Sequence, residues 1–207
     1  MSEPTTGSTG SAAVGLDGAV VVGLGNPEPS YAGNRHNVGA MVVAELAASE
    51  GVNLKRGSGR LARVVSSATR LGGRRAVLAT LTTYMNESGQ PVRPLLDYYK
   101  VEPGYLIVLH DELDLPFGAV RIKQGGGDNG HNGLRSITRS VSSPDYVRVR
   151  IGIGRPMGRQ SPADFVLHDF SAAERTELPA ILDQAARAVS LLIAAGVDRA
   201  QNELHRP

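Results

Sequence analysis

The sequence predicts an α/β fold, specifically a single-domain, three-layer αβα sandwich around a mixed, largely parallel central sheet. The apolar runs at residues 19–22 and 105–109 have the composition of strands that are buried on both faces of a sheet. Segments with apolar residues at helical spacing separate such runs, and this alternation is typical of α/β domains. No internal repeat or linker divides the 207 residues, so we expect one domain over residues 19–207.

Residues 1–18 differ in composition from the rest of the chain. They are rich in Ser, Thr, Gly and Ala and lack the basic start and apolar middle of a signal peptide. We therefore expect this segment to be a disordered leader.

The first half of the chain predicts strands and helices in alternation. In order, these are a strand at 19–25, a helix at 37–51, strands at 61–69 and 75–81, and a helix that carries Val92, Leu95, Leu96 and Tyr99. Gly72-Gly73 between the two middle strands indicates a hairpin. Pro91 and Pro94 leave the start of the second helix open, because proline is accepted in the first turn of a helix only.

The second half continues the pattern. We expect strands at 105–109, 120–123 and 146–153, with a helix at 131–140 between the last two. Residues 155–162 predict a loop that could act as a mobile lid. Ser171 and Glu174 have the spacing of a capping box, and the apolar stripe after them predicts a long helix that ends at Gly196.

Composition excludes several classes of protein. The chain has no cysteine, which rules out disulfides and thiolate metal sites and fits a reducing compartment. No apolar run reaches the length of a membrane span, so we expect no membrane contact.

The formal net charge is only +2, but it is unevenly distributed. No acid lies between Glu50 and Glu87, a segment that contains Lys55, Arg56, Arg60, Arg63, Arg70, Arg74 and Arg75. Such a basic segment could be an ordinary solvated surface or a face that binds a polyanion such as nucleic acid. On the evidence of charge alone, the solvated surface is the favoured interpretation.

Polar residues follow the ends of several predicted strands. Asn26, Asn86 and Asp111 each come after an apolar strand, and parallel strands place such residues at one edge of the sheet. His36 and Asn132 lie on connections that can reach the same edge. Each residue also has a structural reading: Asn26 could begin a turn, Asn86 and Asn132 could cap helices, as could Asp111, and His36 could be structural.

The combination suits hydrolysis without a covalent intermediate. A neutral histidine can take a proton from water, a carboxylate on its other nitrogen stabilises the imidazolium, and asparagine amides can bind an oxyanion or hold carbonyls. Two alternatives are weaker. A dinucleotide fingerprint at Gly23 lacks its third glycine, where Glu28 stands. A metal site could use His110, Asp111, Glu112, Asp114 and His131, but no H-E-x-x-H spacing occurs.

Together, the motifs resemble those of bacterial peptidyl-tRNA hydrolases. They are G-L-G-N-P at 23–27, Tyr31, R-H-N-V-G at 35–39, T-Y-M-N-x-S-G at 83–89, H-D-E-L-D-L-P at 110–116, G-G-G-x-x-G-H-N-G-L at 125–134 and R-I-G-I-G-R-P at 150–156. The resemblance implies a monomeric, cytoplasmic esterase without metal or other cofactor and without an obligate protein partner. Its substrate is peptidyl-tRNA, bound through the acceptor stem and 3′ end.

The resemblance also implies roles for individual residues. His36 corresponds to the general base, Asp111 to the carboxylate that supports it, and Asn26 to a residue that selects peptidyl-tRNA over aminoacyl-tRNA. The expected contacts to the substrate's 3′ end or peptide are Tyr31, Tyr84, Asn86 and Asn132, and those to the tRNA 5′ phosphate are Lys123 and Arg150. Tyr84 stands where the family often has Phe. A non-catalytic RNA-binding protein on the same scaffold and a metal-dependent hydrolase remain as alternatives.

Overall fold

The computed structural model describes residues 15–204, which form a seven-stranded sheet with the order β2-β3-β4-β1-β5-β7-β6. Its strands are β1 (Ala19–Gly23), β2 (Lys55–Arg56), β3 (Val64–Leu71), β4 (Arg74–Leu81), β5 (Leu106–Glu112), β6 (Val120–Gln124) and β7 (Val147–Gly152). The central strands β4, β1, β5 and β7 are parallel, whereas β3 and β6 run antiparallel to their neighbours. The predicted mixed, largely parallel sheet is therefore confirmed.

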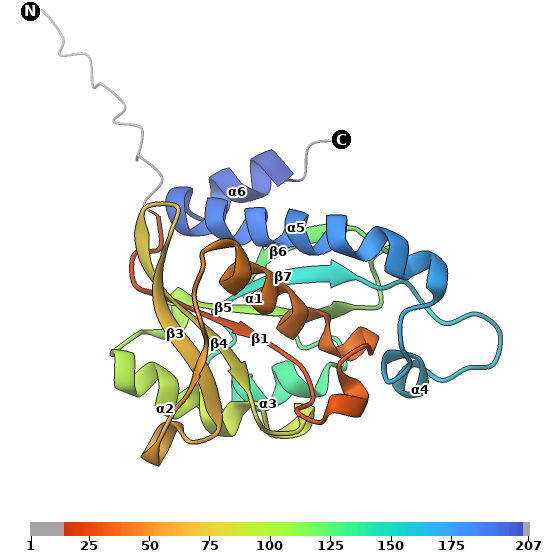
Figure 1. Ribbon diagram of the computed structural model, residues 1–207, viewed down its shortest axis with the longest axis horizontal. Helices are drawn as coiled ribbons and strands as arrows, with labels where there is room; N and C mark the ends of the chain where they lie inside the picture. Colours follow the sequence, from red (N-terminus) through yellow and green to blue (C-terminus); the bar gives the residue numbers. More distant parts are fainter. Residues whose placement is uncertain (1–14, 205–207) are drawn as a thin grey trace, which may run out of the picture.

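Helices cover both faces of this sheet (Figure 1). The α-helices are α1 (Val38–Ser49), α2 (Gly89–Tyr99), α3 (Asn132–Val141), α4 (Pro162–Val166), α5 (Ala172–Ala195) and α6 (Val197–Leu204). Short 3₁₀ turns are η1 (Pro29–Tyr31), η2 (Arg35–Asn37), η3 (Gly59–Leu61), η4 (Met85–Glu87) and η5 (Pro103–Tyr105). One core cluster lies between the sheet and α1, α5 and α6, and a second lies between the sheet and α2 and α3. This arrangement gives the three layers that the sequence predicts.

The register of the parallel strands sets the position of the loops that follow them. Gly23 of β1 pairs with Thr80 of β4 on one side and with Leu109 of β5 on the other. The segments that leave β1, β4 and β5 therefore emerge side by side at one edge of the sheet. Every residue of β1 and β5 is buried, as the continuous apolar runs predict for strands covered on both faces.

Some elements differ from the prediction. The two-residue edge strand β2, the short helix α4 and the C-terminal helix α6 are not apparent from periodicity, because each is short or weakly apolar. Helix α2 begins at Gly89, so Pro94 lies inside it and not in its first turn. The capping box at Ser171 and Glu174 and the end of α5 at Gly196 are confirmed.

Residues 15–18 are packed against the domain, so the expectation of disorder does not hold for them. Leu16 donates its backbone N–H to the carbonyl of Ile193 at 2.9 Å and packs against the core. Asp17 accepts hydrogen bonds from Arg75, and the nearer guanidinium contact is 2.9 Å. Residues 1–14 of the expected leader lie outside the described residues.

Helix α5 is long and apolar enough to cross a membrane by length and composition, with a mean hydropathy of 1.4 over its most apolar stretch. It contains no uninterrupted apolar run of that length, because Asp183 and Arg187 lie within it. Its apolar side chains, among them Ile181, Val189 and Leu192, are buried against the sheet. This packing accounts for the hydropathy of α5 as that of a core helix.

Candidate active site

A cavity of about 700 Å³ opens at the edge of the sheet where β1, β4 and β5 end. Segments from all three strands line it, together with the start of α3 and the helix α4 that follows the loop at 154–161. Of the residues that the sequence singles out, the cavity is lined by Asn26, Tyr31, His36, Tyr84, Asn86, Asp111 and Asn132. Lys123 and Arg150 do not line it; they lie together in a neighbouring cavity.

The position of His36 depends on a close approach between α1 and the sheet. A Cβ atom on Gly39 would lie 2.1 Å from the carbonyl oxygen of Leu109, so only glycine allows this contact. The backbone N–H of Ala40 donates to the carbonyl of Leu24 at 2.9 Å, which ties the helix to the end of β1. Gly25 likewise leaves room for the helix and its start, since its Cβ would meet Ala40 at 3.0 Å. Gly25 and Gly39 therefore allow α1 to pack closely against the end of the sheet.

Asp111 lies between two histidines. Its Oδ1 atom is 2.8 Å from Nδ1 of His36 and 3.0 Å from Nε2 of His131. The side chain of Asp111 is 3% exposed, and that of His36 is 11% exposed. Burial disfavours the charged form of this carboxylate, but the adjoining His36 and His131 outweigh burial and hold the pKa of Asp111 far below its usual value. Asp111 is therefore an anion at neutral pH.

The start of α3 determines which nitrogen of each ring carries the proton. Nδ1 of His131 accepts hydrogen bonds from the backbone N–H groups of Gly133 at 3.1 Å and Leu134 at 3.4 Å, so His131 caps the helix. Because Nδ1 is an acceptor, the proton of neutral His131 is on Nε2 and points to Asp111. The carboxylate in turn accepts from Nδ1–H of His36. Nε2 of His36 is then unprotonated, and no described residue bonds to it.

Asn26 has a defined orientation. Its Oδ1 atom accepts the backbone N–H of Met85 at 2.9 Å, which leaves the Nδ2 amide without a partner among the described residues. The side chain of Asn37 bonds both backbone groups of Asn26, accepting from its N–H at 2.9 Å and donating to its carbonyl at 3.0 Å. The amide N–H group of Asn26 is therefore available to donate to a carbonyl in the cavity.

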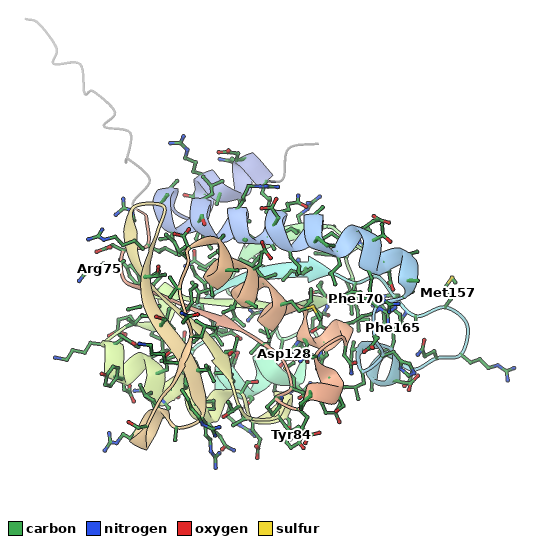
Figure 2. All side chains as sticks on the ribbon, viewed as in Figure 1. Arg75, Tyr84, Asp128, Met157, Phe165 and Phe170 are labelled. Carbon is green, nitrogen blue, oxygen red and sulfur yellow. The ribbon has the colours of Figure 1, made fainter. Side chains whose placement is uncertain are left out.

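The other predicted contact residues lie around the mouth of the cavity. Asn86 lies within η4 and Asn132 begins α3, and neither is a helix N-cap, since Tyr84 and His131 occupy those positions. Tyr84 is 46% exposed, lies at the molecular surface in Figure 2, and donates its hydroxyl proton to Glu28. That hydrogen bond to a carboxylate raises the pKa of Tyr84.

Arg35 holds the segment that carries α4 against the site. Its Nη2 atom is 2.6 Å from Oε2 of Glu174, at the start of α5. Its guanidinium lies 4.2 Å from the centre of the Phe165 ring, which belongs to α4, and 5.5 Å from that of Phe170. Figure 2 shows these two phenylalanines close to each other. Met157, on the loop that projects from the body of the protein, is 91% exposed (Figure 2). The mobility of this loop stays a prediction.

Lys123 and Arg150 line a second cavity of about 270 Å³ beside the first. Arg150 pairs with Glu112 at 2.9 Å, whereas Lys123 has no carboxylate partner within the described part of the chain. Arg148 is opposite Lys123 in the pairing of β7 with β6 and lies two residues before Arg150 on β7. It is 3% exposed, and its Nη2 donates to the carbonyl of Gly126 at 2.6 Å. The glycine-rich loop at 125–130 thus packs against a cation cluster, formed by Lys123, Arg148 and Arg150, that could bind a phosphate.

A metal site is also geometrically conceivable. The ligand atoms of His36, Asp111 and His131 all lie within 4.8 Å of one another. The hydrogen bonds described above account for the same atoms without an ion. The other candidate ligands do not join this group, because Glu112 bonds Arg150 and Asn129, and Asp114 bonds Arg155 and Asn129.

Sequence reasoning missed part of the site. It considered His131 and Glu112 only as possible metal ligands, and it gave no role to Asn37. The available signal for His131 was its position directly before a helix start, where a side-chain acceptor is expected. Nothing local indicates the pairing of Asn37 with Asn26, because the two approach each other only when α1 packs on the sheet.

The sequence and the fold of this chain are similar to those of known proteins. The family model described as peptidyl-tRNA hydrolase matches residues 20–207. The peptidyl-tRNA hydrolase of Frankia casuarinae is 58% identical over 186 residues, covering 90% of this chain and 93% of that protein. The corresponding protein of Nocardia farcinica is 54% identical over 191 residues, covering 90% and 96%. The crystal structure of the Acinetobacter baumannii peptidyl-tRNA hydrolase has a TM-score of 0.83 at 36% identity and covers 91% of this chain and 95% of that one. The chain belongs to the peptidyl-tRNA hydrolase family.

Proposed function

We propose that this chain, which hydrolyses peptidyl-tRNA as its family does, activates the attacking water directly with His36. The bond that it cleaves is the ester between the peptide and the terminal ribose of the tRNA. The observation that carries the proposal is the series of hydrogen bonds from the start of α3 through His131 and Asp111 to His36. This series leaves Nε2 of His36 as a proton acceptor in the wall of an open cavity.

The chemistry follows from these positions. Nε2 of His36 takes a proton from water as the water oxygen attacks the ester carbonyl. Asp111 stabilises the imidazolium that forms and keeps its ring in place. When the tetrahedral intermediate collapses, the ribose oxygen leaves and takes the proton back from His36. The products are a tRNA with a free hydroxyl and a peptide carboxylic acid, which loses its proton to solvent, and His36 returns to its starting form.

We assign to Asn26 the selection of peptidyl-tRNA over aminoacyl-tRNA. Its Nδ2 amide has no partner among the described residues and can donate to a carbonyl of the peptide. An aminoacyl-tRNA has no peptide carbonyl beyond the ester and would leave this donor unpaired. Sites that hydrogen-bond a substrate group reject analogues that lack it, because the polar atoms of the site then stay unpaired.

The cations of the second cavity support tRNA binding. Lys123, Arg148 and Arg150 would bind a phosphate at the end of the acceptor stem without reading base sequence. Tyr31, Tyr84, Asn86 and Asn132 surround the cavity that would receive the 3′ end and the peptide. As the family resemblance implies, we further propose a monomeric enzyme that acts in the cytoplasm without a cofactor or an obligate protein partner.

A cleavage assay of His36→Ala tests the mechanism. Peptidyl-tRNA and aminoacyl-tRNA are each incubated with wild type and variant, with and without a chelator. We expect the variant to lose at least the ~10²–10⁴-fold that general base catalysis supplies, while still binding tRNA. Near-normal turnover by the variant would refute the role of His36. Loss of wild-type activity in chelator would instead favour a metal-dependent hydrolase, and tRNA binding without wild-type turnover would favour a non-catalytic RNA-binding protein.

A further inference from the structure

A third hollow adjoins the active-site cavity on the side away from the cation cluster. It has a volume of about 400 Å³ and is lined by Pro27, Glu28, Arg63, Thr82, Thr83, Tyr84, Glu87 and Gln90. Tyr84 lines both this hollow and the active-site cavity, so its ring forms a shared wall. The mechanism described above makes no use of this hollow.

The order of the strands places the three cavities along the sheet. The cation cluster draws its side chains from β5, β7 and β6. The third hollow draws on the segment that follows β4 as far as the start of α2, on the residue before β3 and on the segment after β1. In the sheet, β4 and β6 lie on opposite sides of β1 and β5, which carry the catalytic residues. A substrate whose phosphate lies at Lys123 and whose ester lies at His36 would therefore direct its remaining part towards the third hollow.

The remaining part of the substrate is the peptide, and Asn26 supports this direction. Its side chain bonds the backbone of Met85, the residue after Tyr84. The Nδ2 amide, which has no partner among the described residues, therefore belongs to a side chain that is bonded to the segment carrying Tyr84. A peptide carbonyl that accepts from this amide would place the next residues of the peptide beside Tyr84.

The chemistry of the hollow suits a peptide better than a phosphate. Glu28 and Glu87 bring two carboxylates that repel phosphates but accept amide N–H groups. Arg63 donates to the side-chain oxygen of Gln90 at 2.5 Å, and its other N–H groups are available to peptide carbonyls. The Thr83 hydroxyl is buried in this wall and has no partner within residues 15–204, so a polar group that reached it would gain a bond that the free protein lacks.

We propose that this hollow is a subsite for the peptide of the substrate, and that it holds the second and following residues counted from the ester. This inference rests on the proposed function. It means that the enzyme gains binding energy from peptide length, with the added contacts supplied by Glu87 and Arg63.

Kinetics on substrates of increasing length test the subsite. The same tRNA is charged with one N-acetylated amino acid or with an N-acetylated tripeptide that ends in that amino acid, and kcat/KM is measured for both. We expect wild type to favour the tripeptide. Arg63→Ala and Glu87→Ala should each reduce this preference by about three- to tenfold, the effect of one lost hydrogen bond. Two independent variants keep the test decisive if one of them fails to fold, as judged by its melting temperature.

The matched controls are Arg93→Ala and Asp97→Ala on the outer surface of α2. These two side chains pair with each other at 3.0 Å and line none of the three cavities. They should keep the wild-type preference. Equal kcat/KM for both substrates in wild type, or an unchanged preference in both subsite variants, would overturn the subsite. Failure of wild type to cleave either substrate would instead overturn the proposed function.

Discussion

Replacing Asp111 with Asn tests the central pairing of the site most directly. The side chain keeps its size, but the negative charge that faces His36 is removed. The amide can also turn its NH₂ group towards Nδ1 of His36, which would move the ring proton to Nε2, the nitrogen that has to accept a proton from water. We therefore expect the variant to fold and bind substrate but to turn over slowly.

The geometry sets the size of the effect. Oδ1 of Asp111 lies 2.8 Å from Nδ1 of His36, and both side chains are nearly buried. With roughly 4 Å between the centres of the two charges and an effective dielectric constant of about 20, the carboxylate stabilises the imidazolium by about 4 kcal/mol. A loss of that stabilisation lowers kcat by about a thousandfold.

The assay is the steady-state cleavage of peptidyl-tRNA by wild type, Asp111→Asn and Asp97→Asn. The Asp97 variant makes the same chemical change on the exposed surface of α2, where Asp97 pairs with Arg93, and should match wild type. Melting temperatures check that both variants are folded. If Asp111→Asn retained more than about a tenth of the wild-type kcat, Asp111 would not be the residue that stabilises the charge on His36.

Three further outcomes follow from the structure. Lys123→Gln and Arg150→Gln should each weaken tRNA binding and reduce the slope of log affinity against log salt by about one, while cleavage of a small ester changes little; an unchanged slope would show that the residue contacts no phosphate. Gly39→Ala should lower the free energy of unfolding by about 1–3 kcal/mol in urea titrations, since its Cβ would clash with the carbonyl of Leu109; wild-type stability would contradict that packing. Burial, followed by the nearby ring of His131, lowers the pKa of His110 to about 3 from 6.5, so the unfolded chain takes up this proton first as the pH falls. Stability should then decrease below pH 6.5 by up to about 1.4 kcal/mol per pH unit, and His110→Asn should flatten this dependence; parallel curves for variant and wild type would argue against a buried neutral His110.

Local sequence patterns predict much of the architecture. Two apolar runs predicted buried strands, and β1 and β5 confirm this prediction. The prediction succeeds because a strand buried on both faces needs continuous apolar residues. The start of α5 is equally local, since Ser171 and Glu174 satisfy each other's backbone N–H groups within one turn. The polar residues after parallel strands predicted a shared edge, and the structure places Asn26, Asn86 and Asp111 there.

Other features depend on contacts between distant parts of the chain. Asp111 meets His36 across 75 positions in sequence, and its proton arrangement depends on how His131 caps α3. Neither relation has a local signature, because a histidine before a helix can cap it without meeting a carboxylate. The packing of residues 15–18 against α5 and the existence of the edge strand β2 also come from distant partners, namely Ile193 and β3.

The sequence by itself thus determined the main strands and helices, which residues follow the central strands, and which family the motifs resemble. The tertiary structure decided which nitrogen of His36 is free, how Asn26 is turned, and which cavities lie beside the site. The physical reason is that secondary structure and helix capping depend on neighbours within a few residues. A hydrogen-bonded site instead depends on tenths of an ångström between elements that meet only when the sheet and its helices pack together.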